Sequence, residues 1–264
     1  MSGLAESVVD VGGVGVVTLE GGSGRPLLML HDELGFPGWL GWNQDLAEGR
    51  RFVVPLQPGF GRTPRVPWFG SVRDVAAFYA RMIRESGLGP VDVVSFSLGG
   101  WIAAEIAAAD PGLINRMVLV APLGVRPDEG EIFDFLAVTM RRHVMTTVSN
   151  QDADELQTIY GGGISAEQYV LFEAARAETS RLAWEPFMFD PSLPFRLEGV
   201  SGVDTLIVWG EDDQVVPRGC AEAYEQALGG CRLEVIAGAG HRPEIEDREQ
   251  FVKVVSAFLE SSSA

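Results

Sequence analysis

Ser97 stands at the junction between an apolar run at residues 91–96 and an alanine-rich run that begins at Leu98. We predict a strand that turns sharply into a helix there, because the residues two before and two after it are the small Ser95 and Gly99. Such a turn exposes the serine hydroxyl and points the next backbone N–H at the same place, which suits a nucleophile beside an oxyanion-stabilising donor. The pentapeptide alone is equally compatible with a helix N-cap.

A serine nucleophile needs a base, and the base needs a carboxylate to orient it. The chain has only three histidines, and His241 follows an apolar run in a glycine-rich loop that can carry an imidazole over a sheet edge. The acid candidates Glu211, Asp212 and Asp213 follow the apolar run 205–209. Because ligands of open α/β sheets bind at the carboxyl ends of the strands, these groups and Ser97 should share one edge.

The composition limits the classes of function. A chain of 264 residues with 46% hydrophobic content predicts one large domain, or one domain with an insertion. The net charge of −17 argues against nucleic acid and anionic membranes as partners and leaves a small-molecule substrate. Lys253 is the only lysine and lies in an apolar-periodic segment, so a phosphate-binding loop and a Schiff base are disfavoured.

Cys220 and Cys231 have neither CxxC spacing nor neighbouring histidines, which argues against a zinc site and suggests two buried, reduced thiols. We expect no metal and no organic cofactor. The first residues lack the charged and apolar regions of a secretory signal, and no apolar run approaches the length of a membrane span. We therefore expect a cytoplasmic protein.

The hydrophobic pattern predicts an α/β fold, with a mostly parallel, doubly wound sheet and helices on both faces. A helix is expected at 72–86 behind a capping box of Ser71 and Asp74, and another after a similar pair at Asp247 and Gln250. The expected strands are continuous apolar runs at 14–19, 27–30, 52–56, 91–96, 117–121, 205–209 and 233–236.

Roughly 80 residues separate the predicted strands at 117–121 and 205–209, far more than a crossover needs. We expect a helical lid inserted at 125–200 into a core domain of 1–124 and 201–264. Helical periodicity is present at 132–140 and again behind a capping box of Ser165 and Gln168. The lid residues that could supply an apolar pocket, or equally pack on the core, are Phe133, Phe135, Met140, Tyr169, Phe172, Trp184, Phe187 and Met188.

Several separate motifs together make the chain similar to α/β-hydrolase fold proteins with a helical cap, over nearly its whole length. The candidate catalytic residues also occur along the chain in the order Ser, Asp, His, which is typical of that family. The resemblance implies that Asp213 is the acid, because it stands three residues after Gly210 and four before Pro217. Some members take the acid from the preceding strand's loop, where Asp128 is nearest. The motifs are PGFGRT (58–63), SFSLGG (95–100), WGEDDQVVP (209–217) and GAGH (238–241).

The main departure from the family lies after the strand 27–30, where His-Gly is usual and this chain has His31, Asp32 and Glu33. The resemblance implies that the backbone N–H groups of Glu33 and Leu98 form the oxyanion hole. One hypothesis turns both acids toward solvent or arginines. The other makes Asp32 or Glu33 a second acid/base or a ligand for a cationic or hydroxylated substrate. We expect His31 to link loops rather than act as a second base.

The resemblance implies a serine hydrolase that cleaves a carboxylic ester, thioester or lactone through an acyl-enzyme intermediate. Related C–C hydrolases typically carry Asn before the nucleophile and Trp after the histidine, where this chain has Phe96 and Arg242, so C–C hydrolysis is an alternative. A non-hydrolytic lyase or cyclase, and a ligand-binding receptor that retains the triad, are the others. The substrate and the oligomeric state stay open.

Overall fold

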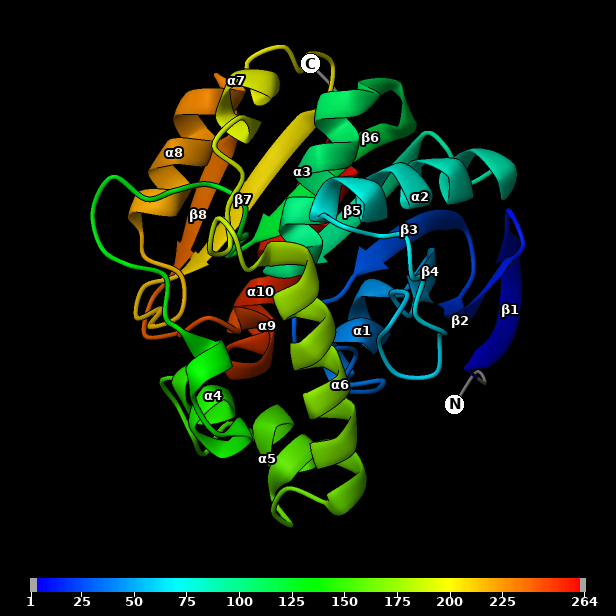
Figure 1. The fold of residues 1–264 in the computed structure, drawn as a ribbon. Coiled ribbons are helices and arrows are strands. Elements are labelled where there is room, and N and C mark those ends of the chain that lie inside the picture. Colours follow the sequence, from blue (N-terminus) through cyan, green and yellow to red (C-terminus); the bar gives the residue numbers. More distant parts are fainter. Residues whose placement is uncertain (1–3, 262–264) are drawn as a thin grey trace.

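The computed structural model describes residues 4–261, which form one eight-stranded sheet flanked by helices (Figure 1). The strand order is β1-β2-β4-β3-β5-β6-β7-β8. The β1–β2 and β2–β4 pairs are antiparallel, and all the others are parallel. The strands are β1 Ala5–Val11, β2 Val14–Gly22, β3 Arg25–Leu30, β4 Arg50–Pro55, β5 Val91–Phe96, β6 Ile114–Val120, β7 Asp204–Gly210 and β8 Arg232–Ile236.

The predicted doubly wound sheet is therefore confirmed, and each predicted strand is present. The prediction missed β1, whose residues are mostly exposed and carry little of the apolar pattern of a buried strand. The α-helices are α1 Gly41–Leu46, α2 Val72–Glu85, α3 Leu98–Ala109, α4 Met140–Thr146, α5 Asp154–Tyr160, α6 Ala166–Ala183, α7 Leu193–Leu197, α8 Gly219–Leu228, α9 Pro243–Glu246 and α10 Arg248–Glu260. Short 3₁₀ turns occupy Pro111–Leu113 and Phe135–Ala137.

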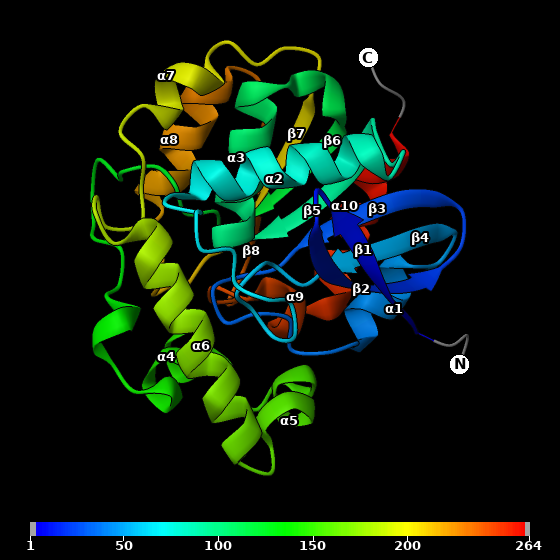
Figure 2. The same cartoon turned by 45° about the vertical axis from the view of Figure 1, so that its right-hand side comes forward.

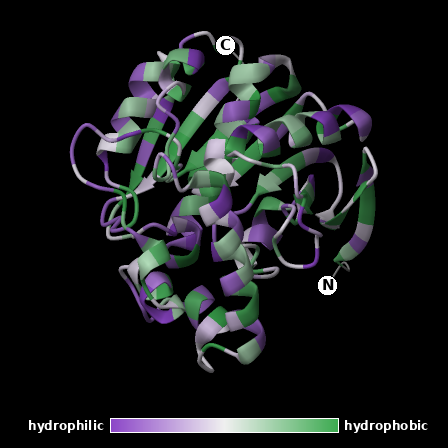
Figure 3. Ribbon diagram, in the orientation of Figure 1, coloured by the Kyte–Doolittle hydropathy of each residue, from purple (hydrophilic) through white to green (hydrophobic). Residues whose placement is uncertain are grey.

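The two faces of the sheet are covered by different helices. Alternate residues of β6 point to opposite sides, so Met117 packs with α2, α3 and α8, whereas Val118 packs with α1 and α10. Strands buried on both faces need apolar residues on both sides, which is why β5 and β6 are apolar over most of their length (Figure 3).

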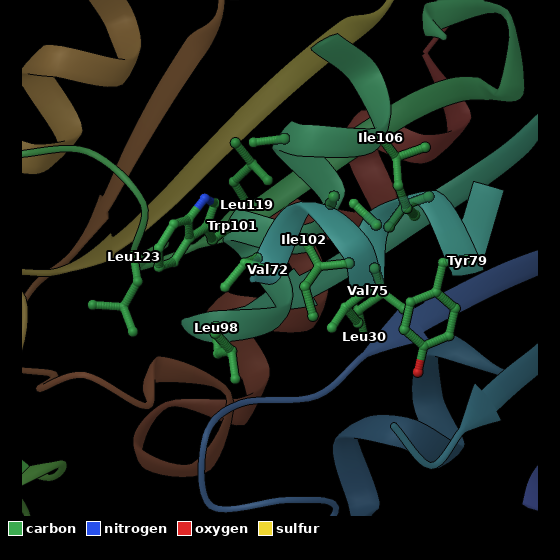
Figure 4. Close-up of a cluster of buried hydrophobic side chains, with 14 of the residues drawn as sticks. Leu30, Val72, Val75, Tyr79, Leu98, Trp101, Ile102, Ile106, Leu119 and Leu123 are labelled. Carbon is green, nitrogen blue, oxygen red and sulfur yellow. The ribbon is translucent and has the colours of Figure 1, made fainter. Parts of the chain in front are cut away.

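Helix α3 is the central helix of one layer, with residues 98–107 all buried. It lies between the sheet and α2, and its Leu98, Trp101 and Ile102 side chains pack among those of α2 and the neighbouring strands (Figure 4). A helix that is apolar on every side is stable only when it is covered on every side. This packing fixes the first turn of α3, and hence Ser97, against the sheet.

Helices α4, α5 and α6 lie together beyond the sheet, on the side toward which β7 and β8 point (Figures 1 and 2). The expected capping box of Ser165 and Gln168 starts α6. A continuous helix over 132–140 is wrong: Asp134 Oδ1 accepts the N–H groups of Leu136 and Ala137 and caps a single 3₁₀ turn. Thr139 then caps α4 separately.

The cap of α2 and the state of the cysteines can be compared with the predictions. Ser71 caps α2, but Asp74 accepts from Gly70 N–H instead of closing the capping box on Ser71 N–H. Both cysteines are free, Cys220 fully buried and Cys231 only partly. Within residues 4–261 no helix has the length and apolar character needed to span a membrane.

The close packing of the turn at Ser97 leaves no space for a side chain at Gly99. A Cβ on Gly99 would lie 2.3 Å from the Leu30 carbonyl oxygen, a backbone atom that cannot rotate away. We expect Gly99→Ala to lower the free energy of unfolding by about 1–3 kcal/mol, as measured by urea denaturation. Gly162 is the control, because a Cβ there meets nothing within 4 Å and Gly162→Ala should change stability by less than about 0.5 kcal/mol. Equal effects of the two substitutions would contradict this packing.

Candidate active site

Ser97 occupies the strained turn between β5 and α3. Its backbone has φ 46° and ψ −110°, a conformation that costs a non-glycine residue of order 1–3 kcal/mol. Three hydrogen bonds hold it: Ser97 N–H donates to Val120 O (2.9 Å), and Ser97 O accepts from Trp101 N–H (3.2 Å) and Leu123 N–H (3.1 Å). Ser95, which replaces the usual glycine, donates its hydroxyl to Val118 O at 2.9 Å and fits without a clash.

His241 and Asp213 are brought together by the loops after β8 and β7. His241 Nδ1 lies 2.8 Å from Asp213 Oδ2, and both side chains are buried. Asp213 Oδ1 accepts the N–H groups of Val215 and Val216 at 2.7 and 2.9 Å, which fixes the carboxylate. The lesser acid candidates Glu211, Asp212 and Asp128 are exposed. Asp213 is thus the one of the four that reaches the imidazole.

The other nitrogen of His241 is available for proton transfer. His241 Nε2 and Ser97 Oγ are both buried, and neither has a hydrogen-bond partner among the described residues. The bond between them that would activate the serine is therefore not formed, and such bonds often tighten only when substrate is bound. Both groups interact with Glu33, which places all three side chains close together.

Acidic neighbours change the basicity of His241. Burial by itself would lower the pKa of His241, but the Asp213 carboxylate, with smaller contributions from Glu33 and Asp32, raises it to about 9. The imidazole is consequently mostly protonated at neutral pH. It becomes a neutral base as the pH rises through about 9.

Asp32 is paired with an arginine that follows the histidine. Asp32 Oδ1 accepts Leu34 N–H at 2.9 Å, and Oδ2 lies 3.5 Å from Arg242 Nη2. Arg242 also contacts Glu244, with Nε 3.4 Å from Oε1, and all three side chains are buried. Burial raises the pKa of Asp32, and the Arg242 charge opposes that rise. Asp32 in place of glycine and Arg242 in place of tryptophan are therefore one structural feature, a buried ion pair.

Glu33 behaves differently from Asp32. Its side chain is 1% exposed, and Oε1 lies 3.1 Å from Nε2 of His143, which comes from α4. Burial would raise the pKa of Glu33, but the hydrogen bond and charge of His143, together with His241, lower it. The Ser97 hydroxyl is near enough to contribute to that lowering, although the two groups do not form a hydrogen bond of ordinary geometry.

His31 links two loops through both ring nitrogens. Gln57 N–H donates to Nε2 at 3.0 Å, so Nδ1 carries the proton and donates to Asp32 O at 2.9 Å. Burial lowers the pKa of His31 to about 4, which keeps the ring neutral. With both nitrogens in use, His31 has none left for a substrate.

The residues 31–35 also decide which backbone donors are free. Leu34 N–H is taken by the Asp32 side chain and Gly35 N–H by the Asp32 carbonyl. The N–H groups of Glu33 and Leu98 donate to no protein acceptor among the described residues. These are the two donors that the sequence assigned to the oxyanion hole.

His143 is the site residue that sequence reasoning missed. Its ring stacks on Phe135 with centroids 4.7 Å apart and meets the edge of Phe172 at 5.7 Å. Of the apolar residues expected to line a pocket, Tyr169 and Trp184 are instead more than half exposed. The scarcity of histidine was the available signal, because all three histidines of the chain are buried in this region.

Comparisons with known proteins identify the family of the chain. A sequence model of the "Alpha/beta hydrolase family" matches residues 27–254. The chain is 28% identical to the dihydrolipoyllysine-residue acetyltransferase component of the acetoin cleaving system of Cupriavidus necator, over 97% of this chain and 69% of that protein. It is 27% identical to the 2-hydroxymuconate semialdehyde hydrolase of Pseudomonas sp. (strain CF600), over 93% of this chain and 90% of that protein.

Among solved structures, one similar to this chain is that of a membrane phospholipase A described as a novel bacterial virulence factor. The TM-score is 0.81, and the match covers 98% of this chain and 86% of that one. At 24% sequence identity, this likeness shows the fold alone.

The acidic surroundings of His241 predict an unusual titration. With only three histidines, their ring C–H signals can be followed by NMR, and we expect one to titrate at about 9. Asp213→Asn should lower that pKa most and Glu33→Gln less, because their charges stabilise the protonated ring in that order. Asp128→Asn, at an exposed site, should not change it. Three histidines that all titrate at or below about 6.5 would contradict this electrostatic arrangement.

Proposed function

The chain belongs to the alpha/beta hydrolase family, and we propose that it is a serine hydrolase that cleaves a carboxylic ester, thioester or lactone through an acyl-enzyme intermediate. The observation that carries this proposal is the 2.8 Å contact between His241 Nδ1 and Asp213 Oδ2, which leaves the buried Nε2 without a partner. A fixed carboxylate, an oriented imidazole and a serine on a strained turn are the parts that acyl transfer requires.

In the proposed reaction, Ser97 Oγ attacks the carbonyl carbon while its proton passes to His241 Nε2. The tetrahedral intermediate then expels the leaving group, which takes that proton from the imidazolium. Water, deprotonated by the same nitrogen, attacks the acyl-enzyme, and collapse of the second intermediate returns the proton to Ser97 and releases the acid. Asp213 holds the imidazole in the right tautomer and stabilises its charged form.

The oxyanion of each intermediate would be held by the N–H groups of Glu33 and Leu98, the latter at the positive end of α3. Preorganised donors of this kind act strongly because the site is dry. The Glu33 carboxylate, on the same residue, lies close enough to oppose that stabilisation unless it is neutralised.

We further propose that residues 125–200 form a cap over this site. Ser97 is 1% and His241 4% exposed, so a substrate reaches them only when a covering element moves. The contact of His143 in α4 with Glu33 in the core joins the cap to the floor of the site.

A second candidate is C–C bond hydrolysis, which the relationship to 2-hydroxymuconate semialdehyde hydrolase favours. Phe96 and Arg242 stand where such enzymes typically have Asn and Trp, and Arg242 is committed to Asp32 and Glu244. Incubation with 2-hydroxymuconate semialdehyde separates the two candidates. A C–C hydrolase would consume this compound and its visible absorbance would fall, whereas an ester hydrolase would leave the absorbance unchanged.

The nucleophile can be tested without knowing the substrate. We expect a neutral fluorophosphonate probe to label the wild-type protein covalently and Ser97→Ala not at all, because the probe bonds to an activated serine hydroxyl. Ser95→Ala is the matched control and should still be labelled, since the Ser95 hydroxyl donates to Val118 O and does not react. Intact-protein mass spectrometry reads the adduct. An unlabelled wild-type protein would rule out the serine hydrolase proposal.

The acid can be tested by the rate of the same labelling. Asp213→Asn should slow it by about 10³–10⁴-fold, because the imidazole loses the carboxylate that fixes its tautomer and stabilises its charged form. Asp212→Asn, which removes an exposed carboxylate next to it, should leave the rate within about twofold. If the two variants label equally fast, Asp213 is not the acid.

A further inference from the structure

Ser97, His241, Glu33 and His143 each have a buried side-chain atom without a hydrogen-bond partner among the described residues. These atoms are Ser97 Oγ, His241 Nε2, Glu33 Oε2 and His143 Nδ1; Arg242 Nη1 and Glu244 Oε2, in the neighbouring ion pair, also lack one. The first two belong to the proposed acyl transfer. The side chains of Glu33 and His143 have no part in that reaction, and a buried acceptor left unpaired is costly enough to need an explanation.

The partners of Glu33 leave one of its two carboxylate oxygens without a hydrogen bond. Oε1 accepts from His143 Nε2, which must carry its proton because a carboxylate can only accept. His143 is in turn held by the stacked ring of Phe135 and the edge of Phe172. The carboxylate is therefore fixed by α4, with Oε2 unpartnered and the Ser97 hydroxyl beside it.

Asp32, one residue earlier, is also buried, but it has no unpartnered carboxylate oxygen. Both oxygens of Asp32 have partners, the Leu34 N–H and the Arg242 guanidinium. Asp32 is thereby neutralised within the protein. Among the described residues no arginine forms an ion pair with Glu33, and its second oxygen has no hydrogen-bond partner.

Resting on the proposed function, the geometry points to Glu33 as a substrate-binding residue whose free oxygen accepts a hydrogen bond from an ammonium or hydroxyl group next to the scissile carbonyl. His143 is its positioning residue. The substrate class is then an α-amino or α-hydroxy acyl compound, because Glu33 neighbours the hydroxyl that attacks the carbonyl carbon and so reaches groups attached close to that carbon.

The charge of the pocket supports this substrate class. A fixed carboxylate beside Ser97 repels the oxyanion that forms from a plain ester. A donor on the substrate removes that repulsion by binding the carboxylate, and an ammonium group also neutralises it. The residue that weakens hydrolysis of an unsubstituted ester therefore selects for a substituted one.

Boronic acids test the inference, because they bond to an activated serine and need no natural substrate. We would measure inhibition constants of butylboronic acid and its 1-amino and 1-hydroxy derivatives by competition with fluorophosphonate labelling at neutral pH. The wild-type protein should bind at least one donor-bearing derivative about tenfold or more tightly than butylboronic acid, as expected for a hydrogen bond to a charged group. A preference for the amino compound identifies an ammonium ligand, and a preference for the hydroxy compound a hydroxyl.

Glu33→Gln should remove most of the preference for the amino compound, and Asp32→Asn should retain it. The two variants lose the same charge at adjacent positions, but only Glu33 has a free oxygen. His143→Asn should weaken the preference, because Glu33 loses its donor. An equal loss of affinity for all three boronic acids in Glu33→Gln would mean a purely structural role and would overturn the inference.

The wild-type comparison alone is decisive even if a variant fails to fold, because equal inhibition constants for the three compounds overturn the inference. Its failure is distinct from that of the proposed function. Labelling of Ser97 without donor preference removes only the role of Glu33, whereas absence of labelling removes the hydrolase itself.

Discussion

Burial of carboxylates around Ser97 is the constraint on which the rest of this site depends. Asp32, Glu33, Asp213 and Glu244 are all buried or nearly so at the carboxyl edge of the sheet. A buried carboxylate is tolerated only with a charged or hydrogen-bonding partner. The positions of His241, Arg242 and His143 follow from that requirement, since each lies against one of these acids.

The same constraint connects the fold to the proposed chemistry. The parallel strands β5, β7 and β8 deliver Ser97, Asp213 and His241 to one edge, where a dry environment strengthens every charge interaction. The acids raise the basicity of His241, so the proposed base works best in alkaline solution. They also make the site hostile to an oxyanion unless the substrate brings a compensating group.

Much of the architecture and part of the site could be predicted from the sequence. Apolar runs identified seven of the strands, because strands covered on both faces are mostly apolar, whereas β1 carries too little of that pattern. Ser97, His241 and the acids at 211–213 could be singled out because each follows such a run, and the family resemblance then selected Asp213. His143 could not, since it belongs to α4, whose position over the site no local pattern encodes.

The sequence by itself determined seven of the strands, the sharp turn at Ser97 and the order of the candidate reacting groups, because these features depend on residues close together in the chain. Only the tertiary structure decided which groups pair with the two unusual acids, Asp32 and Glu33. Asp32 is neutralised by Arg242 and Glu33 is held by His143, partners 210 and 110 residues away. The physical reason is that electrostatic pairing depends on distance in space, and packing of the helices beyond the sheet sets those distances.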